Sequence, residues 1–147
     1  MSVEVVRRGA GKAYSARAVK GTALEILRLL KRENVELSLA LVGNSEMRKM
    51  NARYRGQDYA TDVLSFSAED NLPGPISLLG DVVISVEKAR AQAKERGRSL
   101  KDEMTTLLIH GIVHLLGYDH ERSARDARVM GKLERKIYRS LCERGYL

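Results

Sequence analysis

The chain has 147 residues, of which 44% are hydrophobic and 31% are charged, and this favours one globular domain over residues 1–147 and excludes extensive disorder. A single cysteine, Cys142, excludes an internal disulfide and a cysteine-rich zinc site, and no apolar stretch has the length of a signal sequence or a membrane span, so we expect a cytoplasmic protein. The net charge of +7 makes nucleic acid a plausible partner, although charge of this size is not specific for it.

The first part of the chain alternates between strand and helix patterns. Residues 3–6 are β-branched or charged and predict a short strand, and Ser15 is placed to cap a helix over 18–30. Residues 35–42 predict the next strand. Because apolar residues occupy consecutive as well as alternate positions there, we expect that strand to be covered on both faces.

A second helix and a hairpin follow. Asn44 or Ser45 is expected to cap the helix, which should end in the polar run that follows Tyr54. The strands 63–67 and 80–84 flank the segment 69–75, which contains both prolines of the chain and predicts a hairpin loop. We therefore expect these two strands to be antiparallel neighbours.

Three helices are predicted in the remainder of the chain. Ser85 caps a helix over 86–96, Gly97 ends it, and Ser99 caps the next helix. Altogether the order of elements predicts an α/β fold, a single domain with a small mixed β-sheet of about four strands packed with about five helices.

The last predicted helix is amphipathic. Ser123 and Asp126 resemble a capping box at its start. Its apolar stripe, which predicts a core-facing side, consists of Ala127, Met130, Leu133, Ile137 and Leu141. Its other faces are basic, and suit an RNA-facing surface or a solvated one equally well; they carry Arg125, Arg128, Lys132, Arg135, Lys136 and Arg139.

All three histidines of the chain fall between positions 110 and 120. His110 and His114 are four residues apart, so on a helix both project from the same face. Gly117 suits a left-handed helix exit, after which the turn can bring His120 back as a third ligand. Three nitrogens leave an open position on a tetrahedral ion, which is typical of catalytic zinc. The spacing therefore predicts one Zn²⁺ ion, although other divalent transition metals also suit such a site.

The residue after the first histidine bears on the kind of hydrolysis. The spacing matches the metzincin protease pattern H-E-x-x-H-x-x-G-x-x-H except that Gly111 replaces the glutamate, which is the general base in those enzymes. Another group or the substrate must then serve as base, or the reaction is not peptide hydrolysis. RNA brings its own anionic phosphate oxygens and a ribose hydroxyl to the metal. Gly111 therefore favours RNA over peptide as the substrate.

The motif HGIVHLLGYDH at 110–120 resembles that of the bacterial YbeY endoribonucleases, also called rRNA maturation factors. Asn51 and the segments 54–56, 61–66 and 79–81 are similar to other signature segments of that family, so the resemblance spans residues 44 to 134. It implies a zinc-dependent, single-strand-specific endoribonuclease that acts in 16S rRNA 3′-end maturation and ribosome quality control. The implied partners are single-stranded RNA, 16S rRNA, and the ribosome or ribosomal proteins.

The resemblance also implies a functional role for Arg55. A guanidinium near the metal can clamp the scissile phosphate and stabilise its developing charge, so we take Arg55 and His114 as the candidate catalytic residues, with His110, His114 and His120 as metal ligands. The alternative for Arg55 is a surface ion pair with Asp58 or Asp62.

Two further carboxylates lie near the histidines in sequence. Asp119 can accept a hydrogen bond from a ligand histidine or from its own backbone, and we expect the latter. Glu103 precedes His110 by seven residues, about 10 Å along a helix axis. That is too far for a ligand, and we expect Glu103 to act on the helix dipole rather than to face the cleft.

Two other functions keep the same ligands. One is a metalloprotease-like hydrolase. The other is a non-enzymatic, metal-stabilised RNA-binding ribosome-assembly factor, in which the metal holds the helix exit and the basic surface binds RNA. The sequence assigns neither a general base nor an oligomeric state.

Overall fold

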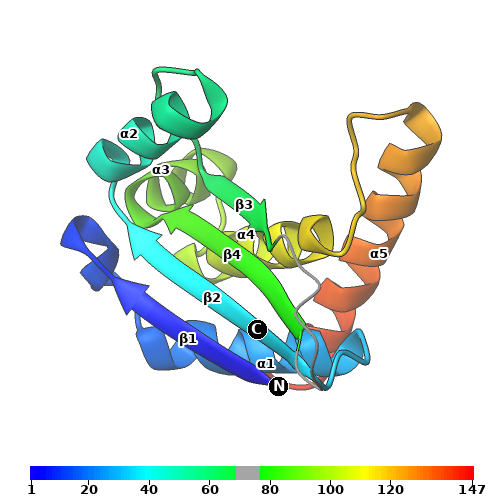
Figure 1. The fold of residues 1–147 in the computed structure, drawn as a ribbon. Helices are drawn as coiled ribbons and strands as arrows, with labels where there is room; N and C mark the ends of the chain where they lie inside the picture. Colours follow the sequence, from blue (N-terminus) through cyan, green and yellow to red (C-terminus); the bar gives the residue numbers. More distant parts are fainter. Residues whose placement is uncertain (69–76) are drawn as a thin grey trace.

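The computed structural model describes residues 1–68 and 77–147, and it confirms an α/β domain with a four-stranded mixed sheet and five α-helices (Figure 1). The predicted hairpin loop at 69–75 lies outside the described residues. The strands are β1 (Ser2–Arg7), β2 (Val35–Val42), β3 (Val63–Ser67) and β4 (Ser77–Ser85). The helices are α1 (Ala16–Leu29), α2 (Asn44–Arg55), α3 (Val86–Arg96), α4 (Leu100–Leu115) and α5 (Ala124–Glu143), with a short 3-10 helix, η1 (Gly9–Ala13).

The sheet has the strand order β1-β2-β4-β3. Strands β1, β2 and β4 are parallel, and β3 pairs antiparallel with β4 at the edge, as expected for the two predicted hairpin strands. The parallel strands are connected through helices, which is the usual connection for parallel neighbours. The edge strand β3 follows the loop after α2 and packs against α4.

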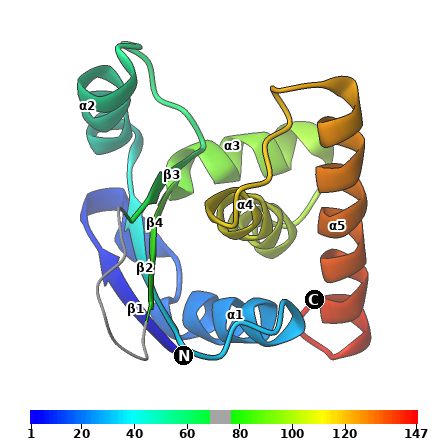
Figure 2. The same cartoon turned by 45° about the vertical axis from the view of Figure 1, so that its right-hand side comes forward.

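Helices cover the two faces of the sheet unequally. Strand residues Leu37, Leu39 and Ile84 face a large core shared with α1, α3, α4 and α5. Figure 2 shows α4 at the centre of this helical layer, with α1, α3 and α5 around it. Of the described helices, only α2 packs on the opposite face, through Met47, over Val83 and its neighbours. None of the helices in the described ranges is long and apolar enough to cross a bilayer.

The expected burial of β2 on both faces is correct only at its carboxyl end. Val42 is buried beneath α2, whereas Glu36 and Ser38, on the same face of the strand, are exposed. The apolar run of β2 therefore reflects the position of α2, which covers only the end of the strand.

Four serines cap helices as predicted. Each side chain accepts a hydrogen bond from a backbone N–H three residues further on, which satisfies a donor that the helix leaves free; these are Ser15, Ser85, Ser99 and Ser123. The prediction for α2 is wrong, because its N-cap is Gly43 and neither Asn44 nor Ser45 caps it. Instead the Glu87 carboxylate of α3 accepts the Asn44 backbone N–H at 2.8 Å. A neighbouring helix thus supplies the acceptor.

Candidate active-site cleft and metal centre

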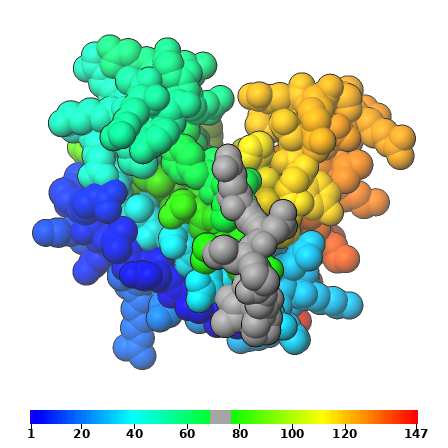
Figure 3. Space-filling view, viewed as in Figure 1, coloured from blue at the N-terminus to red at the C-terminus, as the bar shows by residue number. Residues whose placement is uncertain are grey.

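A cleft of about 640 Å³ opens where the end of α2, strand β3, helix α4 and the α4–α5 loop meet. Figure 3 shows the hollow between the turquoise α2 side and the yellow and orange α4–α5 side. The four predicted site residues all line this cleft: Arg55, His110, His114 and His120. The fold therefore brings together side chains that are far apart in the sequence.

One face of α4 forms the floor of the cleft. Its lining residues are spaced three or four apart, as one helix face requires; they are Glu103, Thr106, Leu107, His110 and His114. Ser99 begins this helix, and Gly117, at φ 98°, turns the chain out of it in the left-handed region, as predicted. The short turn then returns His120 towards His110.

The three imidazoles lie close to one another. The ring centroids of His110 and His120 are 5.4 Å apart, and those of His110 and His114 are 6.4 Å apart. Two imidazoles that share a tetrahedral zinc at the usual Zn–N distance have centroids about 5 Å apart. His110 and His120 already have that separation, whereas the His110–His114 pair is wider, and within residues 1–68 and 77–147 no three such side chains converge closely enough to hold an ion without adjustment.

The carboxylate of Glu134, on α5, orients the first histidine. His110 Nδ1 donates to Glu134 Oε2 at 2.9 Å, which leaves Nε2 as the free nitrogen of that ring. The hydrogen bond to Glu134 raises the pKa of His110; burial opposes this, and the charges of Glu134 and Asp62 add to it. A histidine held by a carboxylate in this way is the usual surrounding of a metal ligand.

The charge of the cleft also fits a cation. Glu103 is compensated by Arg96 and Arg98. Of the other charged residues that line the cleft, three are carboxylates and only Arg55 is a guanidinium; the carboxylates are Asp62, Glu121 and Glu134. A bound cation would offset this excess of negative charge.

Asp119 stabilises the turn that carries His120. Its Oδ1 accepts the Glu121 backbone N–H at 2.8 Å, and this hydrogen bond is the main reason that the pKa of Asp119 is lowered. The expectation that Asp119 bonds to its own backbone is therefore confirmed. Across the same turn, Arg122 Nη2 donates to the Gly117 carbonyl at 2.5 Å. His120 itself stays 48% exposed.

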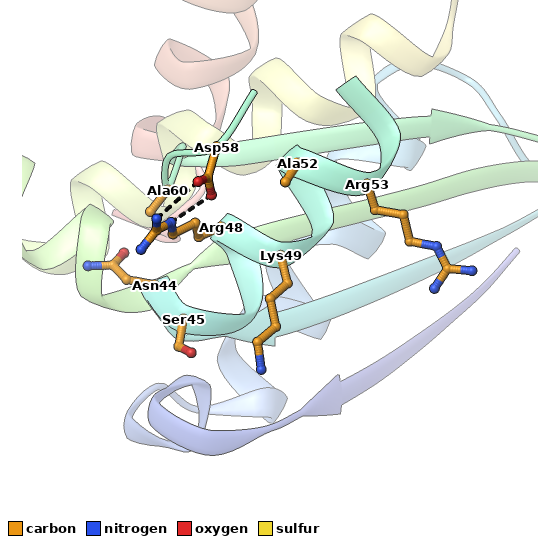
Figure 4. A pocket seen from close by; sticks show the side chains of 8 residues that line it. All are labelled: Asn44, Ser45, Arg48, Lys49, Ala52, Arg53, Asp58 and Ala60. Atoms are coloured by element: carbon orange, nitrogen blue, oxygen red, sulfur yellow. Dashed lines mark hydrogen bonds and ion pairs between the residues drawn. The ribbon is translucent and has the colours of Figure 1, made fainter. Parts of the chain in front are cut away.

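Arg55 is the last residue of α2 and is exposed at the cleft. Asn51, fully buried, holds the segment after the helix, because its Nδ2 donates to the Tyr59 carbonyl at 2.9 Å. The proposed surface pair with Asp58 does not form, since Asp58 pairs with Arg48 at 2.8 Å in a separate pocket on the outer side of α2 (Figure 4). No ion pair of Arg55 with Asp62, or with any other described residue, is found.

Gly111 faces the sheet and is buried. A Cβ at this position would lie 2.6 Å from Val82 Cγ1 of β4, and the Gly111 carbonyl accepts the Ser65 hydroxyl at 3.1 Å. The place of the protease glutamate is therefore occupied by β4, so no larger side chain fits there without a shift of the helix.

Known proteins resemble this chain over most of its length. The family model for "Endoribonuclease YbeY" matches residues 9–142. The chain belongs to the YbeY endoribonuclease family. A YbeY protein of Sulfurihydrogenibium is 44% identical over 90% of this chain and 88% of its own length, and one of Persephonella marina is 43% identical over 88% and 86%.

A solved structure supports the fold. The solution structure of TM1509 from Thermotoga maritima matches with a TM-score of 0.65 at 26% identity, over 92% of this chain and 86% of that one. The YbeY family assignment and the fold therefore rest on separate comparisons.

Glu103 was expected to act on the helix dipole and not to face the cleft, and the structure places it differently. It is fully buried, lines the cleft and pairs with Arg96 and Arg98, so its role is not confined to the helix dipole. Its ion pairs depend on how α3 packs against α4, which the spacing along α4 alone does not reveal.

Glu134 was not assigned a role from the YbeY motif alone. A signal for it exists in the sequence, since it is four residues after Met130 and three before Ile137, and so lies on the buried face of α5. An acidic side chain on an apolar stripe requires a partner. Which partner it finds depends on how α5 packs against α4.

Proposed function

We propose that this YbeY-family chain is a zinc-dependent endoribonuclease that cuts single-stranded RNA at the cleft between α2 and α4. The presence of Arg55 and all three histidines in one cleft is the observation that carries the proposal. Relatives at 43–44% identity are named as endoribonucleases.

His110, His114 and His120 would hold one zinc ion, with Glu134 fixing the first ring. A bound zinc ion would supply Lewis acidity at a phosphoryl oxygen. Arg55 would bind the scissile phosphate and stabilise the charge that develops on it, since a guanidinium can donate two parallel hydrogen bonds to phosphate. Because there is no space for a side chain at position 111, a glutamate base of the protease type does not fit there.

The aromatic wall of the cleft supports a preference for single strands. Tyr54 and Phe66 line the cleft in an edge-to-face arrangement, with centroids 5.2 Å apart, and Tyr54 is largely exposed. Exposed aromatic rings stack on unpaired bases, which a duplex keeps inside its own stack. We further propose, from the family, that the substrate is rRNA, at the 3′ end of 16S rRNA, and that the protein takes part in ribosome quality control.

The test is cleavage of a single-stranded RNA by zinc-loaded protein. We expect His114→Ala to abolish cleavage and Arg55→Ala to lower the rate about 10²–10³-fold. Lys49→Ala is the control, because this exposed cation of α2 lines the outer pocket instead of the cleft (Figure 4). All variants must give the circular dichroism spectrum of the folded protein.

Each alternative function predicts a different result. Equal RNA cleavage by the wild type and by both cleft variants would exclude a nuclease site at this cleft. Metal-dependent cleavage of casein would favour a protease. RNA binding without cleavage, together with loss of folding in His114→Ala, would favour an assembly factor with a structural metal.

A further inference from the structure

A buried carboxylate with two arginines lies at the corner between α3 and α4. Glu103 has no exposed surface. Its Oε1 accepts a hydrogen bond from Arg96 Nη1 at 2.6 Å, and its Oε2 is 3.5 Å from Arg98 Nη1. A carboxylate removed from water is strongly unfavourable without charge compensation, so the two guanidiniums stabilise its burial. With both arginines ionised, one positive charge of the cluster is left uncompensated.

The two arginines use their donors differently. Arg98 Nη2 donates to the Asp102 carbonyl at 3.3 Å and to Thr106 Oγ1 at 2.8 Å, so Arg98 is fixed against α4. Arg96 donates to Glu103 and to no other described residue, and its side chain is 52% exposed. Since a guanidinium has several N–H donors in one plane, Arg96 retains donors for another acceptor.

Arg96 lies in the same cleft as the histidines, at the end nearer to α3. Its partner Glu103 is seven residues before His110, about 10 Å along the α4 axis. A few nucleotides of single-stranded RNA are enough to span this distance. Thr106 and Leu107 line the cleft between the two places. A single strand bound at the histidines can therefore extend along α4 to Arg96.

We propose that Arg96, held by the buried Glu103 carboxylate, binds a second backbone phosphate of the RNA, a few nucleotides from the phosphate at the histidines. The inference rests on the proposed function, because it extends the same cleft. Phosphate is the fitting acceptor, since a planar guanidinium already anchored at one nitrogen presents its other donors in the fork that phosphate oxygens accept. Arg96 is a binding residue remote from the cleavage chemistry, so it should affect KM much more than kcat.

The experiment measures KM and kcat of the zinc-loaded protein on single-stranded oligouridylates of increasing length. For long oligomers we expect Arg96→Ala to raise KM about tenfold, the loss of one charge-assisted contact, with kcat little changed. The slope of log KM against log salt should fall by about one. The shortest oligomers that are cut, which do not reach Arg96, should show no difference from the wild type.

Lys94→Ala is the matched control, because Lys94 is an exposed cation in the last turn of α3 outside the cleft. It should leave KM nearly unchanged at every length, and Arg96→Lys should retain part of the affinity. Because Arg96→Ala leaves Glu103 with less compensation, the double variant Arg96→Ala/Glu103→Gln is tested as well. It should show the same rise in KM for long oligomers.

A KM for Arg96→Ala that equals that of Lys94→Ala, or that rises equally at all lengths, would overturn the inference. The proposed function would still stand in that case, provided that the wild type and Lys49→Ala cut RNA and Arg55→Ala is impaired. A wild type that cuts no RNA at all would refute both.

Discussion

The two histidines of α4 share a helix face but differ at their second nitrogens. Nδ1 of His110 donates to Glu134, whereas Nδ1 of His114 is buried without a hydrogen-bond partner among the described residues. A carboxylate behind an imidazole fixes the ring and makes its other nitrogen a better ligand. We therefore expect the charge of Glu134 to tune the affinity of the proposed metal site.

At this scale we predict that Glu134→Gln weakens zinc binding about 10–100-fold, because the amide keeps the size of the side chain and loses its charge. Zinc affinity is measured by competition with a chromophoric chelator. Glu143→Gln, an exposed change at the end of the same helix, should bind zinc like the wild type. If Glu134→Gln bound zinc as tightly as the wild type does, this carboxylate would have no role in the metal site.

At the scale of elements, the approach of α4 to β4 positions the floor of the cleft. Position 111 must be small because Val82 of β4 lies directly against it, and the Ser65 hydroxyl of β3 bonds to its carbonyl. The glycine thus has a packing reason as well as a catalytic consequence. Its lack of a side chain excludes a glutamate base and also allows the helix to lie close to the sheet.

We predict that Gly111→Ala lowers the free energy of unfolding by about 1–3 kcal/mol, the usual cost of overpacking, although alanine favours a helix more than glycine does. Urea denaturation measures the free energy of unfolding of each variant. In a Val82→Ala background the same change should cost much less. Gly131→Ala on α5 is the control and should be neutral or stabilising, because its Cβ would meet only the end of the Arg135 side chain, at 3.1 Å. If Gly111→Ala were as stable as the wild type, α4 would be able to shift away from β4 at no cost.

The elements themselves follow closely from local sequence. The four strands, the serine caps of α1, α3, α4 and α5, and the stripe of α5 are predicted correctly because each depends on residues near one another in the chain. The cap of α2 is predicted wrongly because Glu87, 43 residues after Asn44, supplies the acceptor. Contacts of this kind depend on how α2 and α3 pack.

At the scale of the whole molecule, the histidines connect the central helix α4 to the loop before α5. An ion that binds the folded chain and not the unfolded one stabilises the fold, by about 2.7 kcal/mol at a free concentration one hundred times Kd. The site should therefore make the stability of the domain depend on metal.

We predict that zinc raises the Tm of the wild type by several degrees and that a chelator reverses the change. His120→Ala should lose this response because it removes the ligand from the loop. Arg125→Ala, an exposed change in the first turn of α5 outside the cleft, should keep it. Differential scanning fluorimetry measures the Tm of each variant with and without zinc. If zinc raised the Tm of His120→Ala as much as that of the wild type, His120 would not be a ligand.

The sequence by itself determined the histidine cluster, the helix that carries two of its members and the turn that returns the third, since spacings of three or four residues and a glycine exit are local properties of the chain. The resemblance added Arg55. Only the tertiary structure decided that Arg55 lines the same cleft as the histidines, that Glu134 supports His110, and that Glu103 and Arg96 extend the cleft. These side chains come from α2, α3, α4 and α5, and their distances depend on how the helices pack, which no local spacing encodes.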